Sequence, residues 1–312
     1  MISHKIIYGY LGDVKSPTSG NKMTLLPGST GKIVWSFDDD ISVVFSRSWA
    51  FTSTDGSFSN TALTRIANDG NATKLVSFPV ITVEKPATLV LKNVNRSYDG
   101  KYKLTLQSCT DTSSEVTIFI AEKPNVTLNC SSPVPLLKGE NFTCLCRGEG
   151  GNPPANVTWF KNGVKISDVE IEKQTVNLLN VGRADNGTYK CEVTSYSHEN
   201  YTEEKSIAVT VYLKPSVTIN CSSPINVRKG DYFICQCMCN GGIPPANCTW
   251  FKNGALIGEI RMEENTLIHR IDSEDGGNYT CVGRSHAIAQ DKKSVNVFVY
   301  CKYLPRVECN FV

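Results

Sequence analysis

Thirteen cysteines are the residues of this 312-residue chain with the clearest chemical potential. Closely spaced cysteines either bind zinc, often as C-x-x-C pairs, or form disulfides in an oxidising compartment. No two of these cysteines stand in a C-x-x-C arrangement. The sequence therefore favours disulfides in a secreted or cell-surface protein, and we expect no metal ion and no cofactor.

Groups that could catalyse a reaction are sparse. Catalysis needs a positioned acid, base, nucleophile or metal, and only four histidines occur, none of them at ligand spacing from another: His4, His198, His269 and His286. The segment GSTGK at 28–32 is too short for a phosphate-binding loop and precedes a strand pattern, so we interpret it as a turn. We expect neither an enzyme nor a small-molecule substrate.

Acceptor sites for N-glycosylation agree with an extracellular location. Chance would supply only about two or three Asn-x-Ser/Thr sites in such a chain. Eleven occur, at Asn71, Asn95, Asn125, Asn129, Asn141, Asn156, Asn186, Asn200, Asn220, Asn247 and Asn278.

The charge pattern excludes two classes of partner. Lys and Arg number 32 against 30 for Asp and Glu, and the charges are interspersed, so no nucleic-acid or polybasic membrane surface is indicated. The first residues, MISHKIIYGYLG, lack the apolar stretch of a secretory leader, and no apolar run is long enough to span a bilayer. We expect the chain to be a fragment of a longer ectodomain.

One segment of the chain repeats at an offset of 91 residues. NCSSPVPLLKGENFTCLC at 129–146 aligns with NCSSPINVRKGDYFICQC at 220–237, and NPPANVTWFKNG aligns with IPPANCTWFKNG. Short runs alternate apolar and polar residues, with turn residues every 8 to 12 positions and no helical periodicity. The repeat predicts two all-β domains of about 90 residues each.

Each repeat has a cysteine, a tryptophan 13 residues later and then D-x-G-x-Y-x-C, which reads DNGTYKC at 185–191 and DGGNYTC at 275–281. This combination resembles the immunoglobulin superfamily. The resemblance implies strand B to strand F disulfides, a tryptophan packed on each, and tyrosine corners. The residues carried over are Cys146, Cys191, Trp159 and Tyr189 in the first repeat, and Cys237, Cys281, Trp250 and Tyr279 in the second. Closing a 45-residue loop stabilises such a fold by about 4 kcal/mol.

The first 120 residues are predicted to form a diverged member of the same family. The first repeat has a glycine seven residues before its strand B cysteine, and the same spacing from Gly28 places Trp35 there. Counting from Tyr102 places Leu104 at the strand F position, and Trp49 is the candidate strand C tryptophan. An apolar pair then replaces the disulfide and can recover roughly 2 to 4 kcal/mol by burial.

The wider spacing of this first domain fits a variable-type domain with extra C′ and C″ strands. The expected strands are KIVWSF, VVFSRSWAF, LTRIA, KLVSFPVITV, ATLVLKNV, GKYKLTL and EVTIFIAE.

The remaining cysteines allow further pairings. Cys130 with Cys144, and Cys221 with Cys235, recur in both repeats and predict a staple between strands A and B. An alternative bonds Cys144, in place of Cys146, to Cys191. Cys239 and Cys248 occur only in the second repeat, near one end of the core, and are paired with each other. Cys109, Cys301 and Cys309 stay unassigned.

Other motifs are interpreted as structural. Asp38, Asp39 and Asp40 could bind calcium, but three adjacent acids are more often a solvated loop. The KGD tripeptide at 229–231 resembles an integrin ligand, yet the other repeat has KGE at the same place in a turn. The PPAN segments at 153–156 and 244–247 could be partner-binding loops, but each carries an acceptor asparagine whose glycan would shield it, so we interpret the prolines as stiffening the connection between strands B and C.

The chain is thus predicted to be all-β, with three tandem immunoglobulin-like sandwiches at 1–120, 121–212 and 213–300 and a tail at 301–312. Short linkers, AEKP and VYLKP, predict a semi-rigid rod. By fold-level analogy, the expected function is cell adhesion or recognition of a cell-surface or matrix protein through domain one, with a second copy of the chain among the candidate partners. The alternatives are a matrix spacer similar to hemicentins and the ectodomain of a growth-factor receptor.

Overall fold

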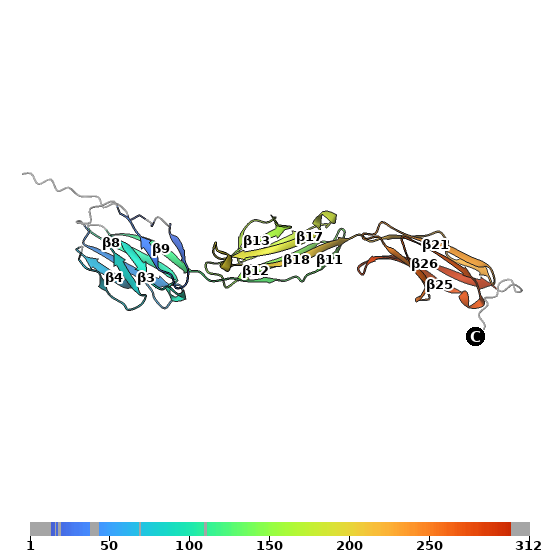
Figure 1. The fold of residues 1–312 in the computed structure, drawn as a ribbon, viewed down its shortest axis with the longest axis horizontal. Helices are drawn as coiled ribbons and strands as arrows, with labels where there is room; N and C mark the ends of the chain where they lie inside the picture. Colours follow the sequence, from blue (N-terminus) through green and yellow to red (C-terminus); the bar gives the residue numbers. More distant parts are fainter. Residues whose placement is uncertain are drawn as a thin grey trace, which may run out of the picture.

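Three β-sandwiches lie end to end along an elongated molecule (Figure 1). The computed structural model describes residues 14–300 except 16, 18–19, 38–43, 69 and 109–110. Within these residues the regular structure consists of strands and four single 3₁₀ turns, and no α-helix is present. The predicted all-β class is confirmed.

The first sandwich packs a six-stranded sheet, in the order β1-β9-β8-β3-β4-β5, against a three-stranded sheet, β2-β7-β6. The 3₁₀ turn η2 (Arg96–Tyr98) precedes β8. The strands are β1 (Lys22–Leu25), β2 (Gly31–Val34), β3 (Ser46–Ser53), β4 (Thr61–Ala67), β5 (Thr73–Lys74), β6 (Ile81–Glu84), β7 (Thr88–Leu91), β8 (Gly100–Gln107) and β9 (Thr112–Ile120).

The second sandwich packs the sheet β10-β12-β16 against a sheet built on β11-β18-β17-β13, whose strand β13 also pairs with the short strands β14 and β15. Its 3₁₀ turns are η3 (Arg183–Asp185) and η4 (Glu199–Tyr201). The strands are β10 (Asn125–Leu128), β11 (Val134–Leu137), β12 (Phe142–Glu149), β13 (Asn156–Lys161), β14 (Val164–Lys165), β15 (Glu170–Ile171), β16 (Lys173–Leu178), β17 (Gly187–Thr194) and β18 (Thr202–Tyr212).

The third sandwich repeats this topology, with β19-β21-β24 packed on β20-β26-β25-β22-β23. Its 3₁₀ turn is η5 (Ser273–Asp275). The strands are β19 (Ser216–Ile219), β20 (Ile225–Arg228), β21 (Tyr232–Asn240), β22 (Asn247–Lys252), β23 (Ala255–Met262), β24 (Glu264–Arg270), β25 (Gly277–His286) and β26 (Ala289–Tyr300).

In the core of each domain, a buried tryptophan is paired with the residue at the position of the strand F cysteine. Trp159 lies directly across the sheet from Cys191, and Trp250 lies across from Cys281. Trp49 has the same relation to Leu104 in the first domain, and both side chains are fully buried. The first domain therefore keeps the packing that surrounds the disulfide in the other two.

One expected strand of the first domain is two strands in the structure. The run KLVSFPVITV at 74–83 divides into β5, which pairs with β4 in one sheet, and β6, which pairs with β7 in the other. Pro79 lies between them and has no N–H to donate to a ladder. The strand β1, which pairs in parallel with β9, was absent from the expected set.

Each domain also has a tyrosine whose hydroxyl fixes the corner before strand F. The hydroxyl groups of Tyr102, Tyr189 and Tyr279 donate to carbonyl oxygens four residues earlier, at 3.0, 3.1 and 3.0 Å. Burial raises the pKa of Tyr279 to about 12, so the phenol stays protonated and can donate at neutral pH.

Tyr189→Phe is expected to destabilise the second domain by about 1 kcal/mol, because the Asp185 carbonyl loses its partner while the ring stays buried. For a domain of this size the melting temperature falls by about 4 to 8 °C, measurable by calorimetry. Tyr201→Phe is the control, since the described structure shows no hydrogen bond from its hydroxyl. Equal melting temperatures for the two variants would contradict the assignment.

Candidate recognition face

Five disulfides lie within the second and third domains, two in the second and three in the third. Cys146 bonds to Cys191 and Cys237 to Cys281 across the two sheets, while the staples Cys130–Cys144 and Cys221–Cys235 join strands A and B. Because Cys144 is bonded to Cys130, the alternative pairing of Cys144 with Cys191 is not the arrangement found.

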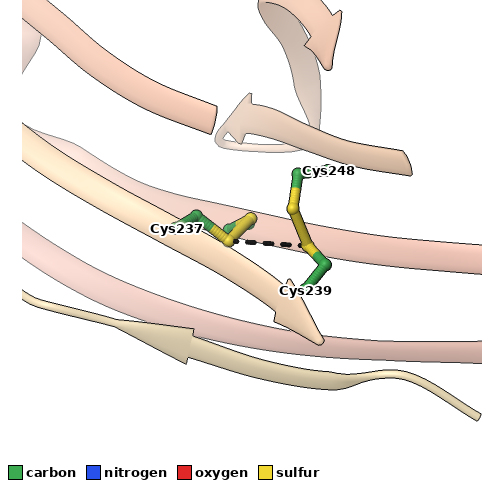
Figure 2. A group of neighbouring side chains, drawn as sticks. Cys237, Cys239 and Cys248 are labelled. Atoms are coloured by element: carbon green, nitrogen blue, oxygen red, sulfur yellow. Dashed lines mark hydrogen bonds between the residues drawn. A yellow bond between two sulfur atoms is a disulfide. The ribbon is translucent and has the colours of Figure 1, made fainter. Parts of the chain in front are cut away.

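The third domain contains one additional disulfide, Cys239–Cys248, which lies beside the Cys237–Cys281 disulfide (Figure 2). The sulfur of Cys239 lies 3.9 Å from that of Cys237, and the four sulfurs lie within 4.8 Å of one another. Among the described residues this is the only cluster with metal-ligand geometry. All four sulfurs are consumed in disulfides, and so none is available as a thiolate ligand.

Three of the motifs interpreted as structural contain turns: GSTGK, KGD and KGE. Gly28 has a φ of 76° in the turn between β1 and β2. The KGD and KGE tripeptides both form turns in which the glycine N–H donates to a carbonyl oxygen that follows a strand, that of Ile271 after β24 and that of Val181 after β16. Asp38, Asp39, Asp40, Cys109, Cys301, Cys309 and His4 lie outside the described residues.

The three described histidines have separate local roles. His198 accepts from the backbone of Asn200, and His269 Nε2 lies 2.8 Å from a carboxylate oxygen of Asp275. His286 stacks on Tyr212 with ring centroids 3.9 Å apart. They belong to different strands and turns, and they do not converge on one site.

All eleven acceptor asparagines are exposed, but their distribution is uneven. Domain one carries two, domain two carries six and domain three carries three. In domains two and three the sheet containing strands C and F carries acceptors on the strands themselves, Asn156 on β13 and Asn247 and Asn278 on β22 and β25. The corresponding strands β3, β8 and β9 of domain one have none.

The outer surface of β3, β8 and β9 is therefore free of glycan acceptors, and we call it, with the adjoining residues of β1 and β4, the domain-one face. The acceptor Asn71 lies at its edge, between β4 and β5. The domain-one face consists of side-chain rows that run across the strands. One row is Arg65, Ser48, Thr105 and Ser113, the next is Ala50, Lys103 and Glu115, and the third is Thr52, Lys101, Thr117 and Lys22.

Basic groups dominate the charge of the domain-one face. Lys22, Lys101, Lys103 and Arg65 contribute four positive charges against the single carboxylate of Glu115. Lys101 lies 3.1 Å from Glu115, and Arg65 donates to Gln107 at 3.4 Å. The face has a net positive charge that a complementary partner must balance.

A buried polar joint connects domain one to domain two. The side-chain amide of Asn152 donates to Asp99 at 2.8 Å and to the Ile120 carbonyl at 2.6 Å. Asp99 also accepts from the Ile120 N–H and forms an ion pair with Arg96. Burial raises the pKa of Asp99, opposed by these hydrogen bonds and by Arg96. Sequence reasoning took this segment as a stiff connection and missed Asn152.

The second joint has the same backbone pairing without the polar core. Leu213 and Ile243 exchange two backbone hydrogen bonds, as Glu122 and Asn152 do at the first joint. Ile243 occupies the position of Asn152 and is 41% exposed, whereas Asn152 is 5% exposed. The two ends of domain two are therefore held by different chemistry.

Comparison with known families decides the identity of the fold. Two models described as "Immunoglobulin domain" match residues 120–195 and 214–299, which together cover more than half of the chain. The chain belongs to the immunoglobulin superfamily. A solved structure of three consecutive immunoglobulin domains of titin superposes with a TM-score of 0.50 at 18% identity, covering 93% of this chain and 99% of that one.

The similar curated proteins are immunoglobulin-superfamily proteins of the cell surface or matrix. Hemicentin-1 of Homo sapiens is 29% identical over 55% of this chain and 3% of its own length. A cell adhesion molecule-related protein of Xenopus laevis is 30% identical over 54% of the chain and 14% of its length. Limbic system-associated membrane protein of Mus musculus is 22% identical over 70% and 64%. The chain thus spans less than two thirds of each.

These immunoglobulin domains are extracellular, like those of the relatives, in agreement with their five disulfides. The described part of the chain contains no helix with the length and hydropathy of a membrane span.

Asn152→Ala is expected to loosen the joint between the first two immunoglobulin domains, because Asp99 and the Ile120 carbonyl lose their shared donor. Asp99 keeps the Ile120 N–H and Arg96 as partners. Removal of the two buried hydrogen bonds from Asn152 costs about 1 to 3 kcal/mol. Small-angle scattering should show a broader distribution of maximum dimensions. Ile243→Ala at the second joint is the matched control and should leave the first joint unchanged; identical profiles for both variants would contradict the role of Asn152.

Proposed function

We propose that this chain is an adhesion or recognition module that binds a protein on another cell or in the matrix through the domain-one face. The observation that carries the proposal is the absence of acceptor asparagines from β3, β8 and β9, whereas the equivalent sheets of domains two and three carry them. Glycans on domains two and three would shield those sheets and leave domain one accessible.

The charge of the face indicates the chemistry of the partner. Four basic side chains surround rows of small hydroxyl groups, so an acidic surface with hydrogen-bonding groups is complementary to it. Two copies of the same face would place Lys and Arg against Lys and Arg. We therefore favour a different protein over a second copy as the ligand of domain one.

The other two domains act as a spacer in this proposal. The joint at Asn152 fixes domain one to domain two through buried hydrogen bonds, so that the domain-one face has a defined direction. A purely structural spacer in the matrix is the second candidate function, favoured by the similarity to hemicentin-1. It predicts that the domain-one face can be altered without effect on binding.

Reversing two charges on the domain-one face, Arg65→Glu with Lys103→Glu, tests the two functions. Fluorescent multimers of the full glycosylated chain are applied to a panel of intact cells and matrix preparations, and binding is measured by fluorescence. We expect the variant to lose about tenfold or more of the binding, and the native binding to weaken as salt rises.

Lys138→Glu with Lys165→Glu in domain two is the matched control, with the same change of net charge, and should bind like the native chain. Equal binding by the native chain and the domain-one variant would refute recognition through this face and favour the spacer.

A further inference from the structure

An apolar stripe, interrupted by the polar pair Gln236 and Thr266, crosses the outer surface of the small sheet of domain three. On β21, Tyr232, Ile234 and Met238 are 64%, 58% and 39% exposed, and on β24 Ile268 is 62% exposed. Ile234 and Ile268 are directly paired across the two strands. Exposed apolar side chains in a contiguous group mark an interaction surface more often than scattered ones do. We call this surface the domain-three face.

Domain two has the same sheet without the stripe. Thr143 and Asn177 stand where domain three has Ile234 and Ile268, and their side chains are hydrogen-bonded at 3.1 Å. Arg147 stands where domain three has Met238. Since both domains fold with the same topology, the fold does not require the exposed isoleucines.

The small sheet of domain three also has fewer glycan acceptors than that of domain two. Asn125 and Asn141 are exposed acceptors on the small sheet of domain two or beside it. The equivalent positions in domain three are Ser216 and Tyr232, which cannot carry an N-linked glycan. Relative to domain two, this face has therefore lost two shielding positions and gained apolar surface.

Charged side chains mark the two ends of the stripe. Glu264 and Arg270 lie at opposite ends of β24, paired with Met238 and Tyr232 respectively. Glu264 accepts a hydrogen bond from Gln236 at 2.6 Å, and no ion pair of Arg270 is found among the described residues. The outward side chains along β24 are Glu264, Thr266, Ile268 and Arg270, so the two ends carry opposite charges and are complementary when the strand is reversed.

We propose that the domain-three face pairs with the same face of a second copy of the chain. The two sheets pack face to face about a two-fold axis that lies in the interface and runs perpendicular to the strands. This axis reverses β24 on β24, so that Arg270 of each copy meets Glu264 of the other. In this register Ile268 and Ile234 of one copy lie over Thr266 and Gln236 of the other, one residue from the axis, so the isoleucine pairs of the two copies are diagonal neighbours. Each copy makes the same contacts, as an isologous interface requires.

The size of the face sets the strength of pairing. Three strands over seven residues present about 15 by 25 Å, which is less than the roughly 800 Å² that each partner buries in a standard interface. We therefore expect a weak dimer, formed only at high protein concentration in solution. Many copies attached to one surface would strengthen it by raising the effective concentration.

An acceptor at Asn220 borders the face on its β19 side. Its side-chain oxygen accepts from the Gln236 N–H at 2.8 Å, and its amide nitrogen lies beside the Gln236 side chain. A glycan there would limit access to the stripe from β19 and leave β24 open. The test therefore includes Asn220→Gln, which should pair at least as strongly as the native chain.

Sedimentation equilibrium of the full glycosylated chain, up to millimolar concentration, measures the pairing. Ile234→Thr with Ile268→Asn installs the pair that domain two already carries, so folding is preserved, and should weaken the dimer about tenfold or more. Leu256→Thr with Ile260→Thr on β23 removes side chains of similar exposure away from the face, 57% and 61%, and should not change it.

Charge reversal tests the orientation. Glu264→Arg alone and Arg270→Glu alone should each abolish the dimer, and the double variant should restore it, because the exchanged charges again face one another. Thermal melting verifies that each variant is folded. A monomer at all concentrations in both the native chain and Asn220→Gln, or an unchanged dimer in the isoleucine variant, would overturn the proposal. A double variant that folds but stays monomeric would overturn the reversed orientation of the two strands.

This inference is independent of ligand binding by domain one. Arg65→Glu with Lys103→Glu should leave sedimentation unchanged, and the isoleucine variant should leave the binding of multimers to cells unchanged at saturating density.

Discussion

The contact between strands B and F across the two sheets is the constraint on which each domain depends. It fixes the distance between the sheets and brings a tryptophan onto the link, as Trp159 does beside Cys191. In domain one the positions predicted for the two cysteines hold Trp35 and Leu104, which are both buried in one core cluster. The disulfide is thus one of two chemical solutions to the same geometric requirement.

The difference between the two solutions appears in the tryptophans. In domains two and three, the indole N–H of Trp159 and Trp250 donates to a backbone carbonyl on the facing strand, at 3.1 and 3.0 Å. In domain one, the indole nitrogens of Trp35 and Trp49 are buried with no partner among the described residues. Domain one therefore depends on apolar packing alone at this position, whereas the others combine packing, a covalent link and a hydrogen bond.

The sequence predicts best those features that depend on local spacing. The spacing of the cysteines, tryptophans and tyrosines in the two repeats predicts the immunoglobulin-like fold, because strand alternation and loop length limit which residues can meet in the core. The division of 74–83 between two sheets was missed, since its apolar pattern continues through Pro79 and only pairing partners reveal the break. Asn152 was missed because its partners, Asp99 and Ile120, belong to another domain. The exposed pair Ile234 and Ile268 could have been found by comparing the outward positions of the repeats.

The pairing of the cysteines tests this account most directly. Peptide mapping of the secreted, unreduced protein by mass spectrometry should recover Cys146–Cys191 and Cys237–Cys281 together with the staples Cys130–Cys144, Cys221–Cys235 and Cys239–Cys248. Recovery of Cys144 bonded to Cys191, or of Cys237 bonded to Cys248, would contradict the placement of the strand B to strand F link at the centre of each core.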